Sequence, residues 1–342
     1  MRVLITGGAG FIGQHVASQL ASRGHETVAM DLLLPQVHSD PEGAVRRFPG
    51  EVIRADVADE QAWEELPSFD ALIHLAAETG TAQSMYERGR YERVNVGGSR
   101  LAARAAAGTG VPVISLSSRA VYGEGLRDED GALRASHEDD PHRPVSFYGE
   151  TKSQAEAALI EESEGKSPAA IIRPQNVIGL GQALRNPYTG VLAAFLARLR
   201  EGRPLSIYGD GSQTRDFVHV ADLAELIVWN LEHMPQTSQP RILNCGTGVR
   251  TSLTKLAEYA AAASPAGASV IEYVDVHRAG DIEHACADLG RLRAVGAPLP
   301  SRTTADAVTD FIVGSWQGDV APSRVWDDAL DELSSRGLVG ES

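Results

Sequence analysis

The sequence reads VLITGGAGFIG from Val3 to Gly13, and this stretch decides the fold. Three apolar residues predict a short strand, the glycines predict a turn, and a helical pattern follows. Gly7 permits the tight turn, Gly10 lets the backbone approach a pyrophosphate, and Gly13 lets helix and strand pack closely. The spacing is G-x-x-G-x-x-G rather than G-x-G-x-x-G, and a plain connector is the alternative. The cofactor-binding residues expected in this turn are Gly7, Gly10, Phe11, Ile12 and Gly13.

Two acidic residues follow the next two predicted strands. Asp31 comes at the carboxyl end of a strand near residues 27–30, about twenty residues after the glycines. A carboxylate there can accept hydrogen bonds from the adenosine ribose hydroxyls and would repel a 2'-phosphate, so NAD is favoured over NADP. A helix N-cap or a solvated turn is the alternative for Asp31. The strand at 52–57 carries Asp56, a candidate partner for the adenine amino group, and Val57.

Two more apolar strands are expected at 71–77 and 113–116. The first contains His74, which we expect to be a hydrogen-bonded core histidine rather than a base. The second ends in a serine pair that includes Ser118, at the carboxyl end of a parallel strand where ligands bind. Small residues of the first strand would let the backbone approach the cofactor, and the cofactor-binding residues expected there are Leu75, Ala76 and Ala77.

Residues 146–152 read SFYGETK, with Tyr148 four positions before Lys152. Residues four apart lie on one face of a helix, so the phenol and the ammonium can address one substrate. A nearby cation lowers the pKa of a phenol, and tyrosinate then becomes a usable base near neutral pH, unlike free tyrosine with its pKa of about 10. Alone, the pair is weak evidence, because helices carry such pairs by chance. The glycine turn and Ser118 make it part of an ordered set.

The composition is that of an ordered globular protein, with 43% hydrophobic and 23% charged residues among 342. The net charge of −15 disfavours a nucleic-acid partner, and a polyanionic ligand must be met by local cations. No apolar run approaches the ~20 residues of a membrane span, and no signal-peptide pattern is present. Cys245 and Cys286 lack metal-ligand spacing, so we expect no metal, and buried thiols in a reducing, cytoplasmic compartment.

Strands and helices alternate without an internal repeat, which predicts an α/β, Rossmann-type doubly wound parallel sheet covered on both faces. We expect a NAD-binding domain at 1–176, to which about 218–249 returns. A smaller, discontinuous substrate-binding lobe is expected at 177–217 and 250–317, with the substrate in the cleft between the lobes. The polar tail at 318–342 receives no functional interpretation.

Together these motifs resemble the extended short-chain dehydrogenase/reductase superfamily, in its NAD-dependent epimerase/dehydratase family. Three later segments are similar to the nucleotide-sugar epimerase and dehydratase branch. They are RPQNVIG at 173–179, LSIYGDGSQTRDFVHV at 205–220 and HRAGD at 277–281. The resemblance covers about residues 1–315, and the motifs are specific as an ordered set.

The resemblance implies a tightly held NAD, with Ser118 and Tyr148 as the catalytic pair. It implies that Lys152 holds the nicotinamide ribose and lowers the pKa of the tyrosine, and that Asn95 belongs to the cofactor site. The implied substrate is a nucleoside diphosphate sugar, whose phosphates suit the planar fork of arginine, although a surface salt bridge is the alternative for each arginine. The implied diphosphate contacts are Asn176, Arg215 and Arg278, and Tyr208 and Asp281 surround the nucleoside. The complete set of expected substrate-binding residues is Thr79, Ser118, Asn176, Arg185, Val191, Tyr208, Arg215, Arg278 and Asp281.

Arg119 and Ala120 follow Ser118, where the sugar 4,6-dehydratases of the family carry an Asp-Glu pair that eliminates water. Neither residue can serve as that acid or base, so dehydration is disfavoured. Residues 117–125 and 186–190 look most like bacterial 4-epimerases for UDP- or dTDP-sugars. We therefore expect an isomerase that inverts C4 through a transient 4-keto sugar and enzyme-bound NADH.

Two other functions remain open. A nucleotide-sugar 4-ketoreductase or dehydrogenase would exchange its cofactor at every turnover, and Asp31 opposes NADPH. A non-catalytic NAD or nucleotide-sugar sensor could use the same fold, although the intact Ser118, Tyr148 and Lys152 argue against it.

The sugar and the nucleotide are not determined by the sequence. Arg185 could pair with a C6 carboxylate, which would indicate UDP-glucuronate or UDP-galacturonate, and an exposed loop arginine is the alternative. Members of the resembled family commonly pair through two helices per subunit, here near 87–107 and 148–163. A homodimer is therefore expected.

Overall fold

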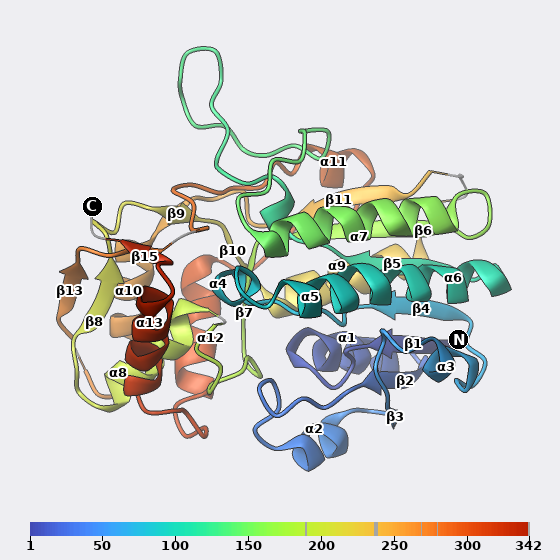
Figure 1. Cartoon of the computed structure of the whole chain (residues 1–342), viewed down its shortest axis with the longest axis horizontal. Coiled ribbons are helices and arrows are strands. Elements are labelled where there is room, and N and C mark those ends of the chain that lie inside the picture. The colour runs from blue at the N-terminus through green and yellow to red at the C-terminus, as the bar shows by residue number, and fades with distance from the viewer. Residues whose placement is uncertain (189, 236–238, 268, 279, 341–342) are drawn as a thin grey trace.

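The computed structural model describes residues 1–188, 190–235, 239–267, 269–278 and 280–340, without the side chains at 277 and 278. Figure 1 shows two lobes side by side, with the large sheet in one of them.

The larger lobe is built on a seven-stranded parallel sheet of order β11-β6-β5-β4-β1-β2-β3. The chain order reverses at β1, where Leu4 pairs with Val28 on one side and Leu72 on the other. Ligands bind at the carboxyl ends of the strands beside such a reversal. The predicted Rossmann-type fold is thus confirmed. The strands are β1 (Arg2–Thr6), β2 (Glu26–Asp31), β3 (Glu51–Arg54), β4 (Ala71–His74), β5 (Val113–Leu116), β6 (Ala169–Pro174) and β11 (Arg241–Cys245).

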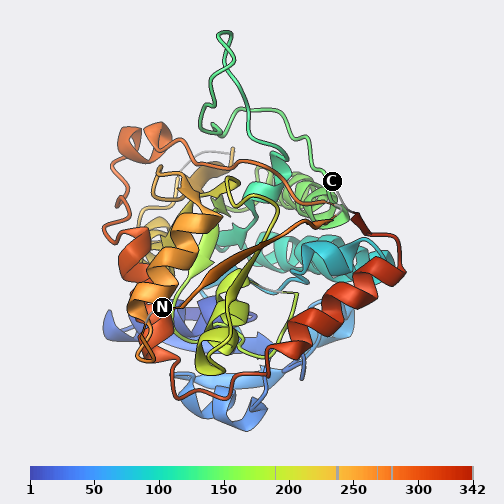
Figure 2. The ribbon, with the colours of Figure 1, turned by 90° about the vertical axis from the view of Figure 1, so that its left-hand side faces the viewer.

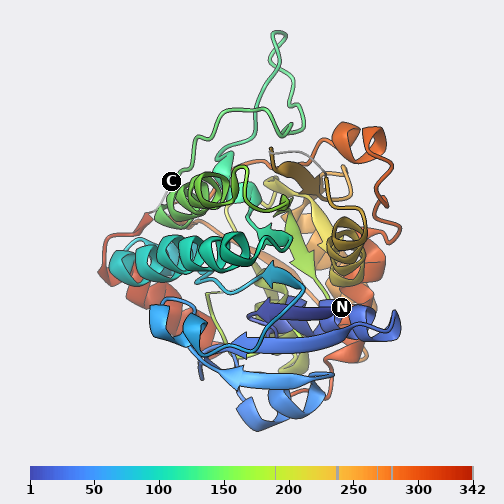
Figure 3. The same cartoon turned by 90° about the vertical axis from the view of Figure 1, so that its right-hand side faces the viewer.

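Helices cover both faces of the sheet (Figure 3). On one face α1 packs against α9, and on the other α6 packs against α7. Strand β1 contributes side chains to the cores on both faces of the sheet. Ile5 belongs to the core under α1 and α9, and Leu4 belongs to the core under α6 and α7. Successive side chains of a strand point to opposite faces, and both faces here are buried. The helices of this lobe include α1 (Phe11–Ser22), α2 (Pro41–Arg47), α3 (Glu60–Glu64), α7 (Phe147–Ser163), α9 (Val220–Glu232) and α11 (Gly290–Ala294).

The helix expected at 87–107 is divided into three parts. A π-helical segment, η1 (Glu92–Gly98), separates α5 (Arg88–Tyr91) from α6 (Ser99–Thr109), and α4 (Thr81–Ser84) precedes them. In η1 the Asn95 side chain bonds both backbone groups of Glu78, at 2.8 and 3.1 Å, and the Thr151 hydroxyl at 3.0 Å. Segments of π-helix often occur at functional sites, and this one fixes the chain that follows β4.

The smaller lobe has its own apolar core, and α13, dark red, lies along the right-hand side of Figure 2. Ala321 and Trp326 of the expected tail belong to that core. Ala287 and Leu292 instead belong to the core of the main sheet, and α11 packs against β11, although we expected 250–317 in the substrate lobe. The remaining elements are β7 (Asn176–Ile178), β8 (Leu205–Tyr208), β9 (Thr214–Arg215), β10 (Phe217–His219), β12 (Thr251–Ser252), β13 (Ile271–Val274), β14 (His277–Arg278), β15 (Val339–Gly340), α8 (Val191–Arg200), α10 (Leu253–Ala263), α12 (Thr304–Gly314) and α13 (Arg324–Ser335).

Cys245 and Cys286 are buried free thiols, as expected. Across the described ranges, no helix combines the length and the apolar character that crossing a membrane requires.

Candidate active site

The glycine turn between β1 and α1 leaves no room for side chains at two of its positions. Gly7 has φ +67°, and a Cβ there would lie 2.9 Å from the backbone nitrogen of Ala76. A Cβ on Gly13 would lie 2.5 Å from the carbonyl oxygens of Gly7 and Gly8. Gly10 is the N-cap of α1; its backbone is extended, and it offers no side-chain cap to the first N–H groups of the helix. These donors and the positive end of the helix suit the pyrophosphate of NAD, so the turn fits the cofactor.

Asp31 is buried at the end of β2. Its carboxylate accepts hydrogen bonds from the backbone nitrogens of Ala9 (3.1 Å) and Leu33 (2.9 Å), and His38 Nε2 lies 3.4 Å away. The carboxylate is therefore held at the glycine turn, as a ribose contact requires. Asp56 lies two residues beyond β3 and pairs with Arg93 at 2.9 Å.

His74 is a core residue, as expected from the sequence. It is bonded to the hydroxyls of Thr6 (2.8 Å) and Ser99 (3.0 Å), and burial lowers its pKa to about 3. The Thr6 hydroxyl also accepts from the backbone nitrogens of Leu75 and Ala76 at 3.2 and 3.3 Å. Through Thr6, the histidine thus holds the backbone of Leu75 and Ala76 next to Gly7, and it does not act as a base.

Ser118, Tyr148 and Lys152 meet at the carboxyl end of β5. Ser118 caps the short 3₁₀ helix η2 (Arg119–Val121), and its hydroxyl lowers the pKa of the Tyr148 phenol against the effect of burial. Helix α7 is capped by Ser146, and it carries Lys152 one turn after Tyr148. The Lys152 ammonium donates to the Leu116 carbonyl at 2.6 Å. Hydroxyl and phenol can therefore address one substrate oxygen.

The electrostatics of the phenol differ from the expectation that Lys152 lowers its pKa. Burial raises the pKa of Tyr148, and this shift is opposed first by the Ser118 hydrogen bond and then by the Arg119 guanidinium. Burial lowers the pKa of Lys152 to about 8, against the opposing charge of Glu156. In this structure Arg119, not Lys152, is the cation that acts on the phenol.

A buried ion pair lies next to the candidate catalytic residues. Glu156 lies one turn after Lys152 and receives two hydrogen bonds from Arg173, at 2.9 and 2.7 Å. Glu156 also accepts a hydrogen bond from Ser117, the residue before Ser118. Both charged side chains are at least 96% buried. The pair thereby ties helix α7 to the ends of β5 and β6.

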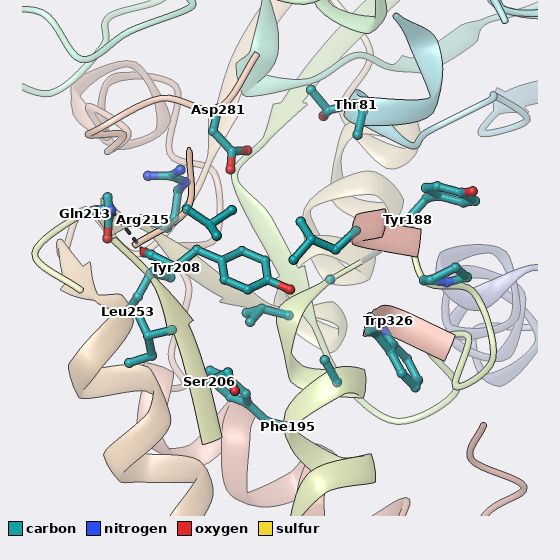
Figure 4. A pocket seen from close by; sticks show the side chains of 18 of the residues that line it. Thr81, Tyr188, Phe195, Ser206, Tyr208, Gln213, Arg215, Leu253, Asp281 and Trp326 are labelled. Atoms are coloured by element: carbon teal, nitrogen blue, oxygen red, sulfur yellow. Dashed lines mark hydrogen bonds between the residues drawn. The ribbon is translucent and has the colours of Figure 1, made fainter. Parts of the chain in front are cut away.

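A cavity of about 280 Å³, called here the interlobe cavity, lies beside this site (Figure 4). The first lobe contributes Thr81 and Arg119. The smaller lobe contributes expected substrate-binding residues, whose side chains enter from β7, α8, β8, β9 and the segment after β14. These expected residues are Asn176, Val191, Tyr208, Arg215 and Asp281.

Two expected substrate residues are placed outside the cavity lining, and a third is not described. Thr79 is exposed, and Thr81, the first residue of α4, lines the cavity instead. Arg185 is 47% exposed and pairs with Asp319 at 2.8 Å, and it is not among the described residues that line the cavity. Arg278 lies in β14, and its side chain is outside the described part of the chain.

The C-terminal helix α13 forms a wall of the interlobe cavity, which the sequence interpretation missed. Trp326, Leu330 and Leu333 line the cavity. Their spacing, at i, i+4 and i+7, is the helical apolar pattern that could have indicated a buried face.

Contacts with both lobes hold this helix in place. The Tyr188 hydroxyl donates to Glu332 at 2.9 Å, and the Arg336 guanidinium lies 4.1 Å from the centre of the Tyr86 ring. Beyond the helix, β15 pairs with β14. The tail therefore joins the strand that carries Arg278 to the rim of the first lobe.

Replacing Leu330 by Trp is expected to raise KM for the substrate about ten- to hundredfold, since overpacking costs about 1–3 kcal/mol. The NAD content should not change, because the glycine turn lies in the other lobe. The matched control is Asp331→Trp, which places the same side chain on the exposed face of α13. Steady-state kinetics and NAD content of both variants provide the test. Equal KM values for the Leu330→Trp and Asp331→Trp variants would contradict the role of α13 as a cavity wall.

Comparison with known proteins agrees with this geometry. The model of the NAD-dependent epimerase/dehydratase family matches residues 3–246. The chain is 38% identical to dTDP-L-rhamnose 4-epimerase of Burkholderia thailandensis over 321 residues, covering 84% of this chain and 87% of the relative. It is 32% identical to UDP-glucose 4-epimerase of Mycolicibacterium smegmatis, covering 91% of this chain and 97% of the relative.

The structure of MoeE5 in complex with UDP-glucuronic acid and NAD superposes with a TM-score of 0.77 at 27% identity, covering 93% of this chain and 99% of that one. The expected cofactor, NAD, is thereby confirmed. The chain belongs to the NAD-dependent epimerase/dehydratase family and is an epimerase, an isomerase that uses NAD.

Proposed function

We propose that the protein inverts C4 of a nucleoside diphosphate hexose. The observation that carries this proposal is the juxtaposition of Ser118 and Tyr148 next to Arg119, which lines the interlobe cavity. Such a pair can act on one hydroxyl group of a sugar, and the relatives named as 4-epimerases support the choice of C4. The nucleotide, UDP or dTDP, and the group at C6 are left to experiment.

In the proposed reaction Tyr148 removes the proton of the C4 hydroxyl as a general base. Ser118 donates a hydrogen bond to the developing carbonyl oxygen and so stabilises the negative charge that forms on it. NAD, when bound, accepts the hydride of C4 and returns it. Tyr148 then returns its proton to the oxygen after the 4-keto sugar has presented its opposite face.

The substrate must stay bound while its sugar turns over, so the nucleotide end needs firm anchors. Arg215 is suited to this role because its guanidinium is fixed by the carbonyl oxygens of Ile282 (2.6 Å) and Glu283 (3.1 Å). Asn176 has a buried side-chain oxygen for which no partner is described, and it lines the cavity. Tyr208 and Asp281 are proposed to surround the nucleoside.

Incubation with candidate sugars and no added cofactor tests this function. The purified protein is given UDP-glucose, UDP-glucuronate, UDP-N-acetylglucosamine or dTDP-L-rhamnose, and proton NMR reads the configuration at C4. Inversion of one substrate without net oxidation is the expected result. Turnover of a 4-keto sugar only with added NADH or NADPH would show a reductase instead.

The protein is further proposed to work as a cytoplasmic homodimer paired through α6 and α7. These helices lie side by side on the outer face of the first lobe in Figures 1 and 3. Sedimentation of the holoenzyme gives the mass, and a monomer at micromolar concentration would exclude the dimer.

A further inference from the structure

Arg119 is a cavity arginine without a described partner. It is the first residue of η2, directly after the catalytic Ser118, and it lines the interlobe cavity. In the described part of the chain no hydrogen bond or ion pair holds its guanidinium. Arg173 and Arg215, by contrast, are fixed by a carboxylate and by backbone carbonyls respectively. A buried cation is costly unless it is paired, so an arginine that faces a cavity without a described partner favours binding of an anionic ligand.

The charges around Arg119 indicate where that anion would lie. Its neighbours are Arg215 and Asp281 on the side of the smaller lobe, Tyr148 on its own side, and Glu124. Burial, followed by the like charge of Arg215, lowers the pKa of Arg119 to about 10. Two guanidinium groups thus converge on one space, and an anion between them would relieve both the repulsion and the desolvation.

We propose that Arg119, together with Arg215, binds the sugar-proximal phosphate of the substrate and so holds C4 at Tyr148. This inference rests on the proposed function. The phosphate is bonded directly to the sugar, and Arg119 lies near both Tyr148 and the expected diphosphate contact Arg215. Every nucleoside diphosphate sugar carries this phosphate, whereas only uronates carry a C6 carboxylate. A guanidinium can bind two phosphate oxygens at once, which lysine cannot do.

The test measures binding of UDP and UMP, and of dTDP and dTMP, to the NAD-loaded protein by calorimetry. Arg119→Ala is expected to weaken binding of the diphosphates about tenfold or more, the usual effect of losing a charged hydrogen bond. The monophosphates lack the sugar-proximal phosphate, so their binding should change much less. Arg119→Lys should restore part of the affinity. The control is Arg293→Ala, an exposed arginine of α11.

Several results would overturn the inference. Diphosphate binding that is unchanged in Arg119→Ala excludes a phosphate contact. Equal losses for mono- and diphosphates would show a general collapse of the site, which the thermal midpoint and NAD content of the variant would reveal. A loss confined to UDP-glucuronate relative to UDP-glucose would assign Arg119 to a carboxylate. If the wild-type protein binds neither UDP nor dTDP, the proposed function itself fails, which is a distinct outcome.

Discussion

The Tyr148→Phe variant is expected to lose about 10²–10⁴-fold in kcat, the usual contribution of a positioned general base. The phenol interacts with Ser118, and phenylalanine keeps the ring but removes the group that takes the proton. Binding of NAD and of nucleotide diphosphates should remain within about twofold, because a group that acts only on the reacting hydroxyl contributes mainly to kcat. Rates at saturating substrate, together with calorimetric dissociation constants, measure both effects.

The matched control is Tyr259→Phe, which removes a hydroxyl from α10, outside the interlobe cavity lining. A Ser118→Ala variant should lower kcat less than Tyr148→Phe, because it removes a hydrogen bond and leaves the base. Should Tyr148→Phe retain a tenth or more of the wild-type kcat, Tyr148 would not be the base.

Local sequence patterns predicted the parts of the site that depend on short segments. The glycine turn fixes a strand, a turn and a helix within 13 residues, and the spacing of Tyr148 and Lys152 requires only one helical turn. The position of Asp31 could be predicted because one strand-helix-strand unit has a typical length, which places the acidic residue about twenty residues after the glycines. These features need no knowledge of how distant segments pack.

The parts that failed depend on contacts across the chain. The sequence analysis used Arg119 only to show that the acidic residue of the dehydratases is absent. Its position beside Arg215 could not be predicted, because it requires the smaller lobe to fold over β5. The same holds for α13, whose apolar face becomes a cavity wall only against α8 and β8. Lys152 and Tyr148 were expected to interact, but their surroundings are set by Leu116, Glu156 and Arg119.

The buried pair of Glu156 and Arg173 gives the largest expected effect on stability. Replacing Arg173 by Met leaves the Glu156 carboxylate, 96% buried, without its cation. Removing one partner of a buried pair costs about 3–5 kcal/mol, because the other charge remains desolvated. Exposed pairs contribute about 0–1 kcal/mol, so Arg185→Met, which breaks the pair with Asp319, is the control. Denaturant unfolding of the two variants measures the difference, and equal losses would contradict the prediction.

The double variant Glu156→Leu/Arg173→Met separates stability from function. Replacing both charges by apolar groups is often neutral or stabilising, so the double variant should be more stable than Arg173→Met alone. Its kcat should nevertheless stay well below that of the wild type. Glu156 accepts the hydrogen bond of Ser117 and its charge raises the pKa of Lys152 against the effect of burial, and an apolar pair can do neither. Recovered stability with recovered activity would show that the pair supports the fold alone; recovered stability without activity would show that it positions Ser118 and Lys152.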